Sequence, residues 1–250
     1  MIKVRNIAQS LYYRLMFPIW RRSFSPSIVR LELEKCGFDF FVGTKQAADW
    51  YDPPKLHTIA EYQWVLENVE YENAQIIDAG AHHGHYSLLF ACADRHPRRI
   101  HSVEPLPGNC AIIKVNAALN NVELNIIQKA ISSHIGIFSF VPRGNGKLFP
   151  GAGIEVQTLE LPSVNDEATI VKLDIEGMEF QLFPTQLDSM PKAQTWIIEI
   201  HPNYGEPEIL IKHFLERNFR SYYLDKNKNV VTRYQSNNKL TYSTSLFFFK

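Results

Sequence analysis

The stretch that most constrains the fold lies at residues 75–90 and has the sequence QIIDAGAHHGHYSLLF. A short apolar run ends at the acid Asp78, a turn follows that contains Gly80, Ala81 and Gly84, and the next apolar residues have helical spacing. This order predicts a strand, a glycine turn and a helix, the opening unit of a parallel α/β sheet. Glycine lets a ligand approach the backbone, and the free N–H groups that start the helix favour a polar or anionic group. We therefore predict that the turn binds a ligand.

Further short apolar runs continue this pattern along the chain. Helices are expected near residues 59–69, 109–119 and 207–216, and strands near 37–43, 75–78, 100–103, 124–128, 136–141, 170–173, 196–200, 220–224 and 242–249. The segment 144–153 contains several glycines and a proline, which predicts a surface loop. Strands that alternate with helices indicate a doubly wound α/β domain, in which ligands bind beyond the carboxyl ends of the parallel strands.

Composition narrows the class of protein. A chain of 250 residues is long enough for one large α/β domain with a small appendage. Its formal net charge of zero argues against a nucleic-acid partner held by bulk charge. The three cysteines lack the spacing of a metal site and are typical of a reducing compartment, and no apolar run is long enough to cross a membrane. We expect a cytoplasmic protein.

The first 30 residues differ from the rest of the chain. They contain six basic residues and no acid, mixed with aromatic residues. Two interpretations stay open. The segment forms a helix that packs on the main domain, or it is an amphipathic segment that makes peripheral contact with an anionic membrane or a lipid-linked substrate.

Polar residues follow the predicted strand ends and suggest a cofactor. Glu104 follows the second strand, twenty residues after Gly84, where an acid can accept hydrogen bonds from ribose hydroxyls. The turn lacks the middle glycine that a dinucleotide's pyrophosphate requires, and an acid two residues before its first glycine fits S-adenosylmethionine instead. The residues expected to bind this cofactor are Asp78, Gly80, Ala81, His82, Gly84, Glu104, Pro105, Ala130 and Asp174.

Several segments together resemble the FkbM-type S-adenosylmethionine-dependent methyltransferases. In chain order they are DAGAHHGHYSL at 78–88, VEPLPGNCAIIKVNAALN at 103–120, TLEL at 158–161, KLDIEGME at 172–179 and IEIHP at 198–202. His82 and His83 stand where the family usually has an asparagine followed by a small or apolar residue. The resemblance implies a seven-stranded methyltransferase sheet of order 3-2-1-4-5-7-6 and methyl transfer to a hydroxyl, often of a sugar or glycoconjugate. We expect an N-terminal helical and β extension at residues 1–60 and an S-adenosylmethionine-binding domain at 61–250.

Methyl transfer to a hydroxyl needs a base that removes the proton during attack. Asp174 and His201 end neighbouring predicted strands, and we favour His201 as the base and Asp174 as the orienting group, although the roles can be exchanged. Glu176 is a further catalytic candidate, although a carboxylate at a helix start also has a structural explanation. No metal is expected. The alternative is a Mg²⁺ ion held by Asp174 with Glu199 or His201.

Two other functions remain open. One is an oxidoreductase that uses a nucleotide cofactor on the same fold, and the other is a protein that binds the cofactor without catalysis. The favoured acceptor is a small molecule, a glycan or a lipid-linked glycan, and not a nucleic acid.

Overall fold

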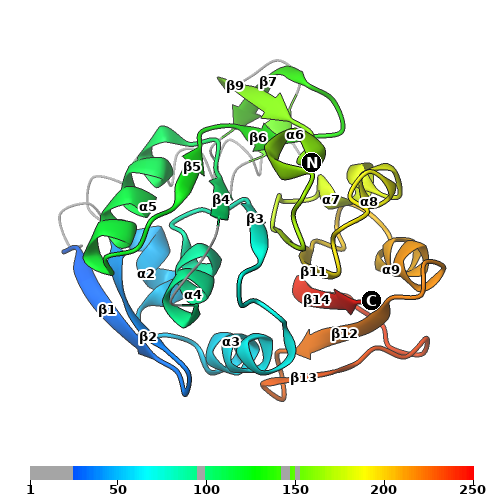
Figure 1. Cartoon of the computed structure of the whole chain (residues 1–250), viewed down its shortest axis with the longest axis horizontal. Coiled ribbons are helices and arrows are strands. Elements are labelled where there is room, and N and C mark those ends of the chain that lie inside the picture. Colours follow the sequence, from blue (N-terminus) through cyan, green and yellow to red (C-terminus); the bar gives the residue numbers. More distant parts are fainter. Residues whose placement is uncertain (1–24, 95–98, 142–146, 150–152) are drawn as a thin grey trace, which may run out of the picture.

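The computed structural model describes residues 25–94, 99–141, 147–149 and 153–250. Its centre is an eight-stranded sheet of order β13-β12-β14-β11-β10-β3-β4-β5 (Figure 1). Strands β5, β4, β3, β10 and β11 pair in parallel, whereas β14 runs antiparallel to both of its neighbours. The bounds are β3 (Gln75–Ala79), β4 (Arg99–Val103), β5 (Asn125–Ile127), β10 (Ile170–Leu173), β11 (Thr195–Ile200), β12 (Arg220–Asp225), β13 (Val230–Arg233) and β14 (Thr244–Phe249). The expected count of seven strands is therefore corrected to eight, because β13 pairs with β12 at the edge.

Successive residues of the central strands point to opposite faces of the sheet, so each strand supplies two cores. Ile76 and Phe247 belong to one buried cluster, whereas their neighbours Ile77 and Phe248 belong to the other. Helices α3 (Leu56–Asn68) and α4 (His85–Ala93) cover the first face. Helices α6 (Leu161–Asn165), α7 (Glu179–Leu182), α8 (Thr185–Asp188) and α9 (Pro207–Leu215) contribute to the core of the second (Figure 1). Apolar residues in unbroken runs suit strands that are covered on both faces.

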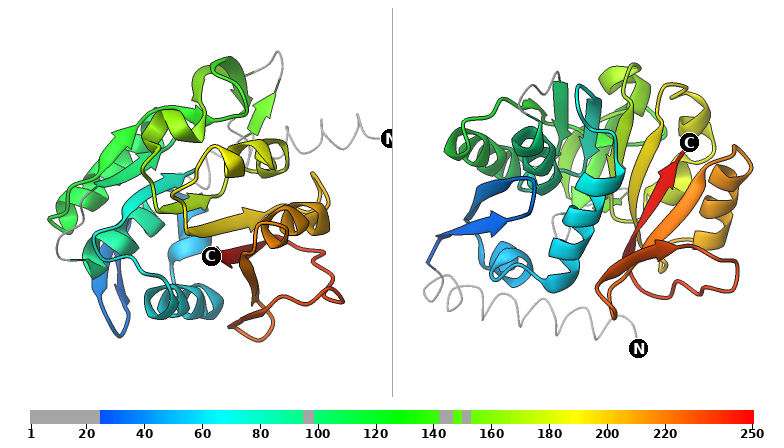
Figure 2. Two further views of the ribbon diagram at one scale, coloured as in Figure 1. Left: turned by 45° about the vertical axis from the view of Figure 1, so that its right-hand side comes forward. Right: turned by 60° about the horizontal axis from the view of Figure 1, so that its bottom comes forward.

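The first described elements, residues 27–51, pack into the same core as α3 and α4. Strands β1 (Ser27–Glu32) and β2 (Gly37–Val42) form an antiparallel hairpin, which α2 (Lys45–Tyr51) follows. Alternate residues of β2 are fully buried and contact helix α4 and helix α5 (Pro107–Leu119). Helix α3 lies between this hairpin and the β12–β13 pair (Figures 1 and 2). The expected boundary between residues 60 and 61 falls inside α3, and the division into two units stays a prediction.

Two segments for which the sequence makes predictions lie wholly or partly outside the described residues. Residues 1–24 lie outside the described residues, so the proposed roles of the N-terminal segment stay predictions. The expected loop at 144–153 also lies partly outside them, and its described part includes β8 (Lys147–Phe149). This strand joins β6 (Ala130–Ile131), β7 (Gly136–Val141) and β9 (Ile154–Leu159) in a separate four-stranded sheet. Within the described ranges, no helix combines the length and the apolar character that crossing a membrane requires.

Candidate active site

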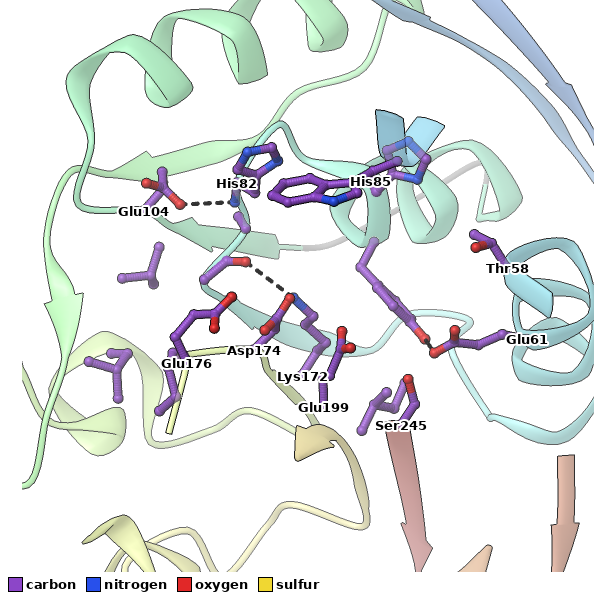
Figure 3. A pocket seen from close by; sticks show the side chains of 18 of the residues that line it. Thr58, Glu61, His82, His85, Glu104, Lys172, Asp174, Glu176, Glu199 and Ser245 are labelled. Atoms are coloured by element: carbon purple, nitrogen blue, oxygen red, sulfur yellow. Dashed lines mark hydrogen bonds and ion pairs between the residues drawn. The ribbon is translucent and has the colours of Figure 1, made fainter. Parts of the chain in front are cut away.

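The predicted polar residues converge at one edge of the sheet because its central strands are parallel. Glu104, Asp174 and His201 each follow directly after a strand that ends at this edge. The antiparallel strand β14 begins there, which brings Ser245 beside Glu199 of β11. A cavity of about 460 Å³ lies at this edge, and side chains from α3, α4 and the strand ends surround it (Figure 3).

The glycine turn forms one wall of this cavity, as predicted. Gly80 has a φ of 71°, and a Cβ at this position would overlap the backbone carbonyl of Asp174, so only glycine fits. The amides of Gly80 and Ala81 both donate to the carbonyl of Val103, which fixes the turn against the next strand. His82 also lines the cavity, with a left-handed φ of 51° that is uncommon for a residue other than glycine.

Glu104 lies beside the turn, with 4% of its surface exposed. Its carboxylate accepts hydrogen bonds from the amide of His82 at 2.9 Å and, on the other oxygen, from Leu106 at 2.9 Å and Asn109 at 3.1 Å. Burial raises the pKa of Glu104 to about 7. Pro105 and Ala130 line the cavity as well, so these three predicted residues are brought together with the turn.

Two residues expected to bind the cofactor do not line the cavity. Asp78 is 1% exposed and lies behind the turn, where it accepts from the amide of Ser87 at 3.0 Å and from its hydroxyl at 2.7 Å. It thereby satisfies the N-terminal turn of α4. Gly84 begins the same helix with a φ of 86° and packs against Ile113. Both residues therefore build the turn, and their contact with the cofactor stays a prediction.

Lys172 is a site residue that the sequence analysis missed. It lies on β10 directly opposite Asp78 of β3, and its Nζ is 3.4 Å from Asp78 Oδ1 and 3.9 Å from Asp174 Oδ2. Its ammonium also donates to the carbonyl of Gly80 at 3.2 Å (Figure 3). Burial lowers the pKa of Lys172, but the two carboxylates outweigh this effect and raise it. The sequence does contain a signal for this role: Lys172 stands in the otherwise apolar strand IVKL, and a buried charge requires charged or polar partners.

Asp174, Glu176 and His201 form a second polar group, located after the ends of β10 and β11. His201 Nε2 is 3.3 Å from Glu176 Oε2 and 3.9 Å from Asp174 Oδ1. Its Nδ1 lies 2.9 Å from Glu179 Oε1, which also accepts the backbone amide of His201. Glu179 is fully buried, and its place at the start of α7 concealed this role in the sequence. Glu176 has a φ of 56°, a strained conformation of the kind found at functional sites.

The environment of His201 does not support its assignment as the base. Burial lowers its pKa, but the hydrogen bond and charge of Glu179 and the charges of Asp174 and Glu176 outweigh burial and raise the pKa to about 9. At this pKa the imidazole is largely protonated at neutral pH, and the choice of base between His201 and Asp174 stays a prediction. Asp174 and Glu176 line the cavity, whereas His201 lies behind them. Burial and the carboxylate of Glu199 raise the pKa of Asp174 well above its usual range.

Two groups of residues in the site contain side chains of the kinds that bind metal ions. The donor atoms of Asp174, Glu176 and His201 lie within 4.8 Å of one another, a spacing that can hold an ion, so the expectation of no metal stays a prediction. His82 and His83 instead stack on each other, with ring centroids 3.9 Å apart. His85 stacks on an aromatic ring of α2, also at 3.9 Å, and burial lowers its pKa to about 3. The rings of these three histidines therefore stack on neighbouring aromatic rings, and His82 and His85 also line the cavity.

Comparisons with known proteins agree with this architecture. A family model described as the methyltransferase FkbM domain matches residues 78–221, more than half of the chain. A methyltransferase FkbM from Methylobacillus flagellatus KT superposes with a TM-score of 0.51 at 14% identity, covering 78% of this chain and 48% of that chain. An S-adenosylmethionine-dependent methyltransferase from Agrobacterium tumefaciens gives 0.52 at 14% identity, covering 90% of this chain and 70% of that chain. No curated protein matches significantly.

The structural matches and the family model support different conclusions. At 14% identity the two structures show an α/β methyltransferase fold, and this chain spans about half the length of the first of them. The family model is the stronger finding, because its match begins at Asp78 and contains the glycine turn, Glu104, Asp174 and His201. The chain belongs to the FkbM methyltransferase family.

Proposed function

We propose that the protein transfers a methyl group from S-adenosylmethionine to a hydroxyl of a sugar or glycoconjugate. The cavity fits this cofactor in two respects: the backbone turn of Gly80 and Ala81 lines it, and Glu104 offers a buried carboxylate to a ribose. Gly80, Ala81, His82, Glu104, Pro105 and Ala130 would hold the cofactor. When bound, S-adenosylmethionine supplies a methyl group on a positively charged sulfur.

The base in this proposal is Asp174. Its carboxylate lines the cavity next to the glycine turn, and its Oδ1 is buried without a hydrogen-bond partner in the described part of the chain. Its pKa is raised to about 8, so the ionised form is the minor form at neutral pH but a stronger base than an ordinary carboxylate, and this form of Asp174 would take the proton of the acceptor hydroxyl as the oxygen attacks. His201 and Lys172 contact Asp174 from two sides and act as positioning residues.

The observation that carries the proposal is that Glu104, the glycine turn and Asp174 line a single cavity. Calorimetric titration of S-adenosylhomocysteine and NAD(H) into the protein tests the cofactor. We expect S-adenosylhomocysteine to bind, Glu104→Gln to weaken binding about tenfold or more through lost charge-assisted hydrogen bonds, and NAD(H) not to bind. The exposed Glu123→Gln is the matched control. NAD(H) binding without S-adenosylhomocysteine binding would favour the oxidoreductase.

Turnover distinguishes an enzyme from a protein that only binds the cofactor. We expect Asp174→Asn to lower methyl transfer about 100-fold or more, with the affinity for S-adenosylhomocysteine nearly unchanged. Near-normal turnover by this variant would contradict its role as the base. Cofactor binding without transfer to a broad panel of hydroxylated acceptors would favour the non-catalytic alternative. A cytoplasmic location and acceptors other than nucleic acids stay part of the proposal, and the zero net charge supports the second of these.

A further inference from the structure

The cavity extends beyond the cofactor-binding residues to a second polar end, formed by Glu61, Tyr86, Glu199 and Ser245. Figure 3 shows Glu104 on one side, Glu61 and Ser245 on the other, and Asp174 between them. Neither the proposed cofactor contacts nor the base uses this polar end.

The sheet brings these groups together through its two-residue period. Glu199 lies two residues after Ile197 on β11, and Ser245 lies two residues before Phe247 on β14. Both apolar residues belong to the core under α3 and α4, so Glu199 and Ser245 point to that same face. Glu61 approaches this face from α3, and it is 7% exposed although it carries a carboxyl group. One face of the sheet therefore changes from apolar to polar at its carboxyl edge.

The partners of Glu61 are hydroxyl groups. Tyr86 donates to Glu61 Oε1 at 2.6 Å, and the hydroxyl of Ser245 lowers the pKa of the same carboxyl group. Burial raises the pKa of Glu61, and these two hydroxyls offset part of the rise. Lys226 pairs with Glu199 at 3.4 Å. A buried carboxyl group that is held by hydroxyls favours further hydroxyl donors. The carboxylates of Glu61 and Glu199 repel a phosphate or carboxylate placed beside them, whereas Lys55 and Lys226, which also line the cavity, attract one.

A second observation points to a ligand in this cavity. His85 is 9% exposed and lines the same cavity. Its Nδ1 hydrogen-bonds the Tyr62 hydroxyl at 2.7 Å, whereas its buried Nε2 has no hydrogen-bond partner among the described residues. A buried polar atom without a partner is costly, and a hydroxyl of a bound molecule would satisfy it.

We propose that this polar end is the acceptor subsite, and that it takes an uncharged polyhydroxylated ring whose non-reacting hydroxyls bind Glu61, Glu199 and His85. The inference rests on the proposed function, because it places the reacting hydroxyl at Asp174. It adds that the subsite rejects rings with a phosphate or carboxylate group at this end.

The test combines two binding measurements on the full chain. S-adenosylhomocysteine is titrated into the wild type, Glu61→Gln and Ser245→Ala. Saturation-transfer NMR then measures binding of methyl hexopyranosides, hexose 6-phosphates and hexuronic acids, with and without S-adenosylhomocysteine. We expect at least one neutral glycoside to bind, the anionic sugars not to bind, and Glu61→Gln to weaken the neutral ligand about tenfold. Glu67→Gln, an exposed glutamate of the same helix, should change nothing.

The outcomes separate this inference from the proposed function. Loss of S-adenosylhomocysteine binding in Glu61→Gln, to the extent seen in Glu104→Gln, would assign this end to the cofactor and overturn the inference. Three other results would also overturn the inference. They are that no neutral glycoside binds, that anionic sugars bind equally well, or that Glu61→Gln and Ser245→Ala leave the affinity for the neutral glycoside unchanged. Failure of the wild type to bind S-adenosylhomocysteine would refute the proposed function instead, while glycoside binding without it still decides the subsite.

Discussion

The charge on His201 gives a prediction whose size follows from the structure. Its pKa is raised from an ordinary value of 6.5 to about 9 by carboxylates that surround a buried ring. A group whose pKa is higher in the folded than in the unfolded state stabilises the fold below the unfolded pKa, and this stabilisation is lost as pH rises through the folded value. Between pH 6.5 and pH 9 the protein should therefore lose about 3 kcal/mol through His201.

The assay is urea unfolding of wild type and His201→Gln at several pH values from 6 to 10. Glutamine can still donate to Glu179 but carries no charge. The stability difference between the two proteins should be largest near pH 6 and shrink by about 3 kcal/mol by pH 10. Glu104 titrates in both proteins and cancels, so this difference reports His201 together with the neighbouring carboxylates whose pKa its charge changes. The exposed His134→Gln is the control. Parallel pH profiles for wild type and His201→Gln would refute the charged imidazole and restore His201 as a candidate base.

Three further substitutions test parts of the site. Gly80→Ala should cost at least about 2 kcal/mol in urea unfolding because of its left-handed φ and the overlap with the Asp174 carbonyl, whereas Gly108→Ala, in open space, should cost little. Lys172→Met should move the acid limb of the methyl-transfer pH profile upward by about one to three pH units, because the ammonium lowers the pKa of Asp174; an unchanged profile would contradict this. Asn116→Ala should cost about 3 kcal/mol, since its buried amide group bonds two backbone groups, and a loss below 1 kcal/mol would contradict it.

The sequence predicted what depends on short-range pattern. The apolar runs located every strand of the parallel core, because strands covered on both faces are uniformly apolar. Parallel strands bring their carboxyl ends to one edge, so Glu104 and Asp174 were correctly expected to meet. The edge strands β1 and β13 were not expected, because their burial patterns alternate or are mostly exposed and carry a weaker signal.

The remaining features of the site depend on distances between residues far apart in the chain, which the spacing of residues in the sequence does not give. Asp78 follows the turn's pattern, yet the structure places it behind the turn against Ser87. The raised pKa of His201 depends on Glu179 at the start of α7, and only the fold places this carboxylate beside the imidazole. Glu61 lies among apolar residues of α3, and nothing in the helix pattern indicates that it faces a cavity rather than solvent. Each of these depends on long-range packing.

The position of β14 has a consequence for synthesis on the ribosome. This strand is made after all the others of the sheet, yet it lies between β11 and β12, and all six of its residues are buried. A nascent chain that has emerged only as far as β13 would expose the unpaired edges of two strands and would lack Ser245. Because unpaired edges favour association, such an intermediate should depend on chaperones until residue 249 has emerged. Completion of the sheet and of the polar end of the cavity is then a single late event.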